Sequence, residues 1–321
     1  MFRTTSKLFT SSAPVAVSAK IVLIRWSHTE VKIPVAWGHI AGKWWNNDGR
    51  RPILAVHGWQ DNANSFDAVV PLMSSKLPVL AIDLPGHGRS SYFPEGFPYH
   101  RMTAIIALKS IMEHFDWQKV SLMGHSLGGQ TCLLFSTVFP EQVDSLATLD
   151  ILAPIPMNSS RFVKSGGKTI DEFLKRDAQK PETAPTHTLE ELVEMIKKSP
   201  ISPVSEVAAK ALVERGSVKC ENGKFRWTRD PKLKGIPLSG WTEHDILKFC
   251  EEIKTNVLCI KAESSSYFSK KEFFEECWSV IKRVAKTSDL RYAPGGHDFH
   301  LEHPEIIAPI LDEFFRKHYN I

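Results

Sequence analysis

The stretch Val120-Ser121-Leu122-Met123-Gly124-His125-Ser126-Leu127-Gly128-Gly129 decides the fold. An apolar run of strand length leads directly into G-x-S-x-G, and a helical pattern follows over residues 127–138. A serine on such a strained strand-to-helix turn needs small residues two before and two after it. The turn also presents the Ser126 hydroxyl at the helix N-terminus, where backbone N–H groups favour developing negative charge. The stretch therefore predicts a nucleophilic serine.

Short strand patterns and helix patterns alternate on both sides of this stretch. Residues 20–26 and 31–45 are expected as the early strands of a hairpin or meander, and further strands are expected at residues 52–56, 79–82, 120–123, 146–149, 257–260 and 290–293. Helices are expected at residues 65–75, 102–115, 127–138, 270–284 and 304–317. This alternation predicts an α/β fold with a mostly parallel central sheet and helices on both faces.

The alternation stops between Ile151 and Trp241, where the chain carries eight prolines. Charged helices are expected there at residues 189–197 and 206–215, with a hairpin that turns at Asn222-Gly223. An insertion of about 90 residues in an otherwise regular α/β chain indicates a helical cap. We therefore expect a leader at residues 1–29, a core made of residues 30–150 and 242–321, and a cap at residues 151–241.

The charge and the composition exclude several classes of protein. The net charge is +4, and residues 1–29 account for all of it with four basic and no acidic residues. The remaining chain, with 36 basic and 36 acidic residues, has no basic excess for binding nucleic acid. No apolar run reaches the roughly 18–20 residues that cross a bilayer. The five cysteines are scattered without C-x-x-C spacing, which argues against a disulfide framework or a zinc knuckle.

The first 29 residues are rich in Ser, Thr, Lys and Arg and contain no acid, the composition of a mitochondrial transit peptide. The alternative is a disordered basic tail on a cytoplasmic or peroxisomal protein. A secretory signal is disfavoured because no apolar segment of about 7–15 residues follows the charges. We expect mitochondrial localisation.

A serine nucleophile needs a base that is oriented by an acid. On this type of fold the order along the chain is serine, acid, histidine, so the base should follow the last strand. Gly295-Gly296-His297 stands there, and His297 is the predicted base, with His300 as an alternative base or a pocket residue. His297, His300 and His303 form an H-x-x-H-x-x-H run, which also suggests a zinc site. A zinc site is disfavoured because no cysteine and few acids are nearby.

Two residues are candidates for the acid. Asp150 ends the strand at residues 146–149 and is favoured, and its alternative role is to cap the next turn. Glu263 follows the strand at residues 257–260, a common place for the acid, where this chain has no aspartate. Glu263 is therefore the alternative acid.

The oxyanion hole is expected from two backbone N–H groups, those of Leu127 and Trp59. Trp59 belongs to His57-Gly58-Trp59, which follows a predicted buried strand. The glycine-rich loop at residues 83–90 is interpreted as scaffold for the rim of the site, since it lacks the Lys-Ser/Thr of a phosphate loop. Trp59 and Phe66 are predicted either to line an apolar acyl pocket or to pack in the core.

These motifs together resemble the α/β-hydrolase superfamily, and the resemblance covers Val31 to Tyr319. Within it the chain resembles the serine hydrolase-like (kraken-like) family. The matching stretches lie at residues 35–41, 57–63, 257–262 and 294–297. The resemblance implies a serine-dependent hydrolase fold with a helical cap, no cofactor, and catalytic roles for Ser126 and His297. That family also lacks the usual aspartate after the penultimate strand.

The resulting hypothesis is a serine-dependent hydrolase that cleaves a small, mostly apolar ester or related acyl compound through an acyl-enzyme. No cofactor, metal, nucleic acid or membrane-spanning segment is expected. Epoxide hydrolase and haloalkane dehalogenase chemistry are disfavoured because both use an aspartate nucleophile, whereas position 126 is serine. The alternatives are a C–C or thioester hydrolase with the same three residues, and a non-catalytic protein that binds a ligand or partner in the cap cleft.

Overall fold

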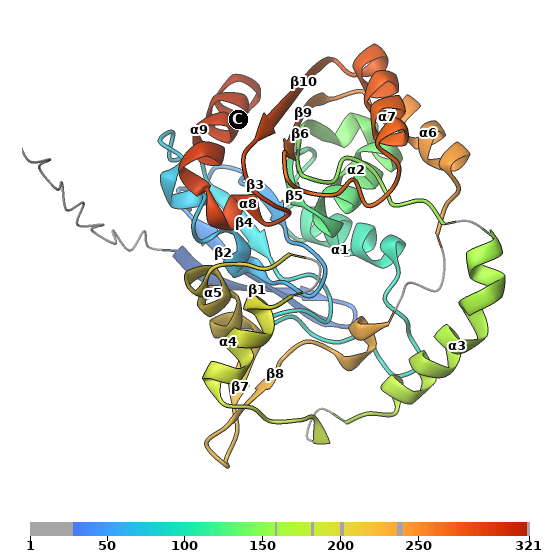
Figure 1. Ribbon diagram of the computed structural model, residues 1–321. Helices are drawn as coiled ribbons and strands as arrows, with labels where there is room; N and C mark the ends of the chain where they lie inside the picture. The colour runs from blue at the N-terminus through green and yellow to red at the C-terminus, as the bar shows by residue number, and fades with distance from the viewer. Residues whose placement is uncertain (1–27, 158, 181–182, 200–201, 236–239, 320–321) are drawn as a thin grey trace, which may run out of the picture.

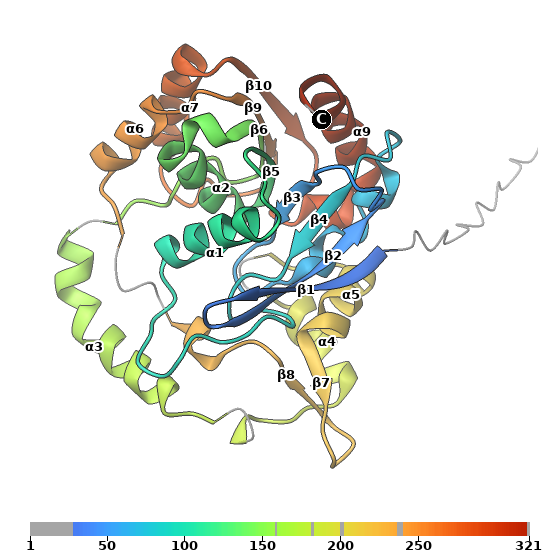
Figure 2. The same cartoon turned by 180° about the vertical axis from the view of Figure 1, so that it is seen from behind.

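The structure is a computed structural model that describes residues 28–157, 159–180, 183–199, 202–235 and 240–319, shown from two sides in Figures 1 and 2. The strand predicted at residues 20–26 and nearly all of the predicted leader lie outside the described residues. Among the helices within these ranges, none combines the length and the apolar character needed to cross a membrane.

One large sheet runs through the molecule, as Figures 1 and 2 show. Its eight strands, in spatial order, are β1 (His28–Val35), β2 (Gly38–Trp45), β4 (Val79–Ile82), β3 (Ile53–Val56), β5 (Val120–His125), β6 (Val143–Leu149), β9 (Asn256–Ala262) and β10 (Thr287–Ala293). β2 pairs antiparallel with β1 and with β4, and all other neighbours pair in parallel. The predicted mostly parallel sheet is confirmed, and residues 31–45, expected within a hairpin or meander, form most of the β1–β2 hairpin.

Helices cover both faces of the sheet, so that β3, β4, β5, β6 and β9 are buried along their whole length. One buried cluster contains α1 (Arg101–His114), α2 (Leu127–Val138), α6 (Glu243–Glu251) and α7 (Lys271–Val284). The cluster on the opposite face contains α8 (Phe299–Glu302) and α9 (Pro304–His318). Burial on both faces explains why these strands read as continuous apolar runs in the sequence.

The helix expected at residues 65–75 is wrong. This segment forms two short 3₁₀ helices, η1 (Ala63–Phe66) and η2 (Val70–Leu72). Pro71 lies in the middle of the expected helix, where it has no N–H to donate and its ring disfavours a continuous α-helix. Asn62 caps the first of the two turns by accepting a hydrogen bond from the Asn64 amide.

An insertion separates β6 from α6, and its helices and its hairpin lie in the lower half of Figure 1. The insertion contains α3 (Ser159–Asp177), α4 (Leu189–Lys197), α5 (Glu206–Gly216), β7 (Ser217–Lys219), β8 (Phe225–Trp227) and the 3₁₀ helix η5 (Pro231–Lys234). α4, α5 and the hairpin of β7 and β8 stand where the sequence predicts them. α3 was not predicted, because Gly166 and Gly167 weaken its helical pattern.

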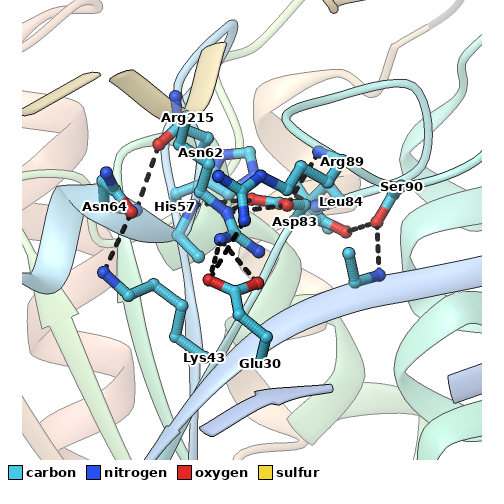
Figure 3. Close-up of polar contacts among 12 residues, drawn as sticks. Glu30, Lys43, His57, Asn62, Asn64, Asp83, Leu84, Arg89, Ser90 and Arg215 are labelled. Carbon is cyan, nitrogen blue, oxygen red and sulfur yellow. Dashed lines mark hydrogen bonds and ion pairs between the residues drawn. The ribbon is translucent and has the colours of Figure 1, made fainter. Parts of the chain in front are cut away.

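A buried ion pair connects the insertion to the core (Figure 3). Arg215 lies in the last turn of α5 with a side chain that is 1% exposed, and its Nε is 2.9 Å from each carboxylate oxygen of Asp83. Asp83 follows β4 and has a side chain that is fully buried. Arg215 Nη1 also donates to Glu30 of β1 at 2.8 Å. The arginine therefore joins α5 to two strands of the sheet.

Two further side chains of the core, Asn62 and Asn64, bind α5 near its C-terminal end. Asn62 donates to the carbonyl of Leu212, and Asn64 donates to the carbonyl of Ala211, each at 2.9 Å. Both carbonyls lie in the last two turns of α5, so the two amides bind the helix near its C-terminal end. This half of the insertion is thus fixed to the core by directional polar contacts.

We expect Arg215→Met to lower the free energy of unfolding by about 3–5 kcal/mol, because it leaves the Asp83 carboxylate buried without its counter-charge. Urea unfolding followed by tryptophan fluorescence measures the loss. Arg89→Met is the matched control, since Arg89 also pairs with Glu30 but its side chain is 50% exposed. That control should lose no more than about 1 kcal/mol. Equal losses in the two variants would contradict the anchoring role of Arg215.

Candidate active site

Ser126 stands on the sharp turn between β5 and α2. Its backbone has φ 53° and ψ −114°, a conformation that L-residues rarely adopt. A Cβ on Gly128 would lie 1.9 Å from the carbonyl oxygen of Val56, and a Cβ on Gly124 would lie 2.4 Å from the backbone of Gly128. Both positions therefore admit only glycine, which is the physical reason for the spacing of the G-x-S-x-G motif.

The register of the parallel strands brings the ends of four strands to one edge of the sheet. Gly124 of β5 pairs with Val56 of β3 and with Thr148 of β6, and Thr148 pairs with Cys259 of β9. The carboxyl ends of these strands consequently meet in one row, the place where open α/β sheets hold their sites. Ser126 follows β5 in this row, and Asp150 follows β6.

His297 comes from the loop between β10 and α8 and completes a chain of hydrogen bonds. Its Nε2 is 2.8 Å from Ser126 Oγ, and its Nδ1 is 2.5 Å from Asp150 Oδ2. An ionised carboxylate only accepts, so Nδ1 is the donor. Nε2 of the neutral ring is then free to accept the serine hydroxyl proton. The structure thus brings together the three residues that the sequence singled out.

Asp150 is deeply buried and well supplied with donors. Besides His297, its carboxylate accepts from Lys261 Nζ at 2.5 Å, the Ala262 amide at 3.2 Å and Ser265 Oγ at 2.6 Å. Burial acts to raise the pKa of Asp150, but the hydrogen bonds and positive charge of His297 and Lys261 outweigh it and hold the pKa below its usual value. Asp150 therefore stays ionised where it faces His297.

Glu263, the alternative acid, does not reach the histidine. It lies on the turn after β9 with an exposed side chain, while Asp150 occupies the Nδ1 side of His297. Lys261 and Ser265, from the same strand end and turn, do contact the carboxylate and were not predicted. The sequence signal for Lys261 was a lone cation at the end of an apolar strand run, which resembles an ordinary exposed strand end.

His300 and His303 do not extend the hydrogen-bonded chain. His300 is fully buried and its Nε2 lies 2.9 Å from Ser65 Oγ, whereas the side chain of His303 is 42% exposed near Glu305. His300 is therefore not in place to serve as the base. The H-x-x-H-x-x-H run does not converge on one point, since His297 and His300 pack beside His125 whereas His303 lies near Glu305 at the surface.

A different group has the side-chain types of a metal site. His125, Asp298 and His300 each offer one ligand atom, and these atoms lie within 4.8 Å of one another. Burial and the nearby His297 lower the pKa of His125 to about 4, and burial together with His125 and His297 lowers that of His300 well below its usual value. Both rings are therefore neutral near pH 7. His125 Nε2 and the carbonyl of His297 are 3.0 Å apart, so His125 also supports the loop that carries His297.

Ser126 and His297 open onto a cavity of about 600 Å³. Its mostly apolar walls include Trp59, Leu84, Leu127, Ile151, Ile155, Met157, Leu233 and Phe268. Leu84, Pro85 and His87 belong to the loop at residues 83–90, which forms part of the rim as predicted. Phe66 is not among the lining residues, because it is fully buried in the core cluster that contains α9.

The loop after β3 lies directly against the serine. A Cβ on Gly58 would be 3.3 Å from the Cβ of Ser126 and 3.0 Å from His125 Nδ1. The absence of a side chain at this position lets the backbone between Gly58 and Trp59 approach the serine closely. Trp59 and Leu127, the two residues predicted to donate backbone N–H groups, both line the cavity beside Ser126.

Comparison with known proteins agrees with this fold. Residues 51–304 match the family model described as alpha/beta hydrolase fold. A probable serine hydrolase of Drosophila melanogaster is 31% identical over 91% of this chain and 88% of its own length. The human serine hydrolase-like protein 2 is also 31% identical, over 90% of this chain and 94% of its own length.

Among solved structures, a hypothetical protein of Pseudomonas aeruginosa PAO1 superposes with a TM-score of 0.79. It is 25% identical and covers 89% of this chain and 99% of its own. The family model covers most of the sequence, and the two animal relatives extend over nearly all of it. The chain therefore belongs to the α/β hydrolase fold family, as a hydrolase of the serine hydrolase-like group.

Proposed function

We propose that this chain is a serine-dependent hydrolase that cleaves a small, mostly apolar ester or related acyl compound through an acyl-enzyme. The observation that carries the proposal is the hydrogen-bonded chain of Ser126, His297 and Asp150 at the wall of a cavity. The names of the fly and human relatives, both serine hydrolases or serine hydrolase-like, support it.

In the proposed reaction Ser126 Oγ attacks the acyl carbonyl carbon while His297 Nε2 accepts the hydroxyl proton. The imidazolium that forms is stabilised by the Asp150 carboxylate at Nδ1 and then gives its proton to the leaving group. A water molecule, activated by the same nitrogen, attacks the acyl-enzyme and releases the acid. Asp150 stays ionised throughout and fixes the orientation and tautomer of the ring.

We propose the backbone N–H groups of Leu127 and Trp59 as the oxyanion hole. Leu127 is the first residue of α2, where the N–H groups have no partner within the helix and the helix dipole favours negative charge. The close approach of Gly58 to Ser126 supports the amide of the next residue, Trp59, as the second donor. Each donor is expected to contribute about 2.7–4 kcal/mol to transition-state stabilisation.

The cavity supports a small, largely uncharged acyl group. A volume of about 600 Å³ is within the range of small-molecule sites, and its apolar walls come from both the core and the insertion. We therefore propose that residues 151–241 act as a cap whose Ile155, Met157 and Leu233 select the acyl chain. Thioesters or C–C bonds beside a carbonyl would use the same three residues, and matched esters and thioesters of graded acyl length distinguish these substrates.

The first test is covalent labelling with a fluorophosphonate probe. We expect the wild-type protein to be labelled and Ser126→Ala to remain unlabelled, because only an activated serine attacks phosphorus at a useful rate. Ser199→Ala is the matched control, since Ser199 also lines the cavity but has no part in the proposed chemistry. It should be labelled like wild type. A folded wild-type protein that is not labelled would favour the non-catalytic binding protein.

The second test compares the two candidate acids. Asp150→Asn should lower kcat by about 10⁴, because the amide favours the wrong tautomer of His297. Glu263→Gln should leave kcat within about twofold of wild type, since Glu263 does not contact the histidine. Hydrolysis of a chromogenic ester by the two purified variants measures both effects. High activity in Asp150→Asn together with loss in Glu263→Gln would reverse the assignment.

We also propose import into mitochondria. The support is the composition of residues 1–29, with Arg3, Lys7, Lys20 and Arg25 and no acidic residue. Native protein purified from mitochondria should begin between about residues 13 and 30, as read by N-terminal sequencing. Cytosolic fractionation of a protein that begins at Met1 or Phe2 would reject the proposal.

A further inference from the structure

Lys261 is a buried cation in direct contact with the proposed acid. Its side chain is 1% exposed and that of Asp150 is fully buried, with Lys261 Nζ 2.5 Å from Asp150 Oδ1. The ammonium group also donates to the carbonyl of Ser266 at 3.1 Å and lies 4.8 Å from the ring centre of Tyr267. A lysine held this far from water needs a specific partner, and Asp150 is that partner.

The pairing follows from the register of two parallel strands. Leu149 of β6 lies opposite Ile260 of β9, and the amide of Asp150 donates to the carbonyl of Ile260 at 2.8 Å. The next residues of the two strands, Asp150 and Lys261, are therefore neighbours. The contact is built into the sheet and does not depend on a flexible loop.

The net charge of Asp150, Lys261 and His297 indicates how Lys261 acts on the protonation of His297. With Lys261 present, Asp150, Lys261 and His297 together have no net charge while His297 is neutral. They carry one positive charge when His297 takes up a proton. Without the ammonium group, the buried carboxylate would be neutralised only by protonation of His297 or of Asp150 itself. Burial disfavours net charge, so the lysine changes which protonation state of His297 the site favours.

We propose that Lys261 is a positioning residue for the acid, whose ammonium group neutralises buried Asp150 so that the neutral, proton-accepting form of His297 is favoured. The catalytic role that this gives to Lys261 rests on the proposed function. The protonation of His297 itself is a property of the folded chain and is measurable without a substrate.

Other titratable side chains face His297, Asp150 or His125 from neighbouring elements. They are Asp61 after β3, His125 of β5, Cys259 of β9, Tyr267 before α7, Asp298 before α8 and His300 of α8. Burial raises the pKa of the Cys259 thiol and, together with Asp298, that of Asp61, while burial lowers those of His125 and His300. All of these groups are the same in wild type and in a Lys261 variant, so their contribution cancels in the comparison.

The experiment is a pH titration of the histidine rings by NMR, with the full-length chain labelled with ¹⁵N at histidine. The His297 signals are assigned by their loss in His297→Gln. We expect the midpoint of His297 protonation to rise by at least about one pH unit in Lys261→Met, because the variant removes a positive charge next to Asp150. The pH dependence of fluorophosphonate labelling should shift in the same direction and by the same amount.

Lys43→Met is the matched control. Lys43 is also a buried lysine on a strand, β2, and its Nζ is 2.5 Å from Asp67 Oδ1. Both variants should lower the melting temperature, but only the Lys261 variant should move the midpoint of His297. A shift of equal size in Lys43→Met would overturn the proposal, since it would reflect general loosening of the fold.

If Lys261→Met does not fold, the test is repeated with Lys261→Gln, which is also neutral and keeps a hydrogen-bond donor. A midpoint that is unchanged or lower in a folded neutral variant overturns the proposal. Failure of the proposed function is seen separately, as absence of labelling in the wild-type protein. The NMR titration then still decides whether Lys261 controls the protonation of His297.

Discussion

The parallel register of β3, β5, β6 and β9 is the constraint on which the site depends. Because Val56, Gly124, Thr148 and Cys259 lie in one row across the sheet, the chain leaves each strand at the same edge. The turn at Ser126 is possible only because Gly128 lets α2 pack directly against the carbonyl of Val56. A methyl group there would separate α2 from β3 and displace the serine from His297. The strand pairing therefore fixes where Ser126 and Asp150 stand relative to each other, and the loop after β10 adds His297 between them.

The insertion is joined to this site through α5. Its own apolar cluster is small and contains Leu192, Val193, Ala209 and Val213. A second small cluster places Ala208 and Leu212 of α5 against Leu301 of α8, four residues after His297. On its other side α5 pairs Arg215 with Asp83, which follows β4. One helix of the insertion thus contacts both the strand ends and the segment that carries the histidine.

The sequence predicted the serine and the histidine because their signals are local, in the glycine spacing around Ser126 and in the loop after the last strand. It favoured Asp150 over Glu263 but could not decide between them, since that choice depends on the pairing of β6 with β9. Lys261 was missed for the same reason, as its partner lies 111 residues away in the chain. The helix predicted at residues 65–75 is wrong because Pro71 interrupts it. The sequence did not predict α3, because two glycines weaken its helical pattern. Local patterns predict elements and turns, whereas contacts between strands distant in sequence follow only from the fold.

The absence of an aspartate after β9 and the presence of Lys261 are two aspects of one arrangement. Asp150 lies fully buried at the end of β6, where a carboxylate stays ionised only if donors surround it. Three of the donors described above, Lys261, the Ala262 amide and Ser265, come from β9 and its turn. A second carboxylate directed inward from this turn would repel Asp150 and compete for the same donors. With the acid on β6, the end of β9 is free to supply the positive charge and hydrogen bonds that the acid needs. Glu263 accordingly points to solvent, where its charge does not oppose that of Asp150.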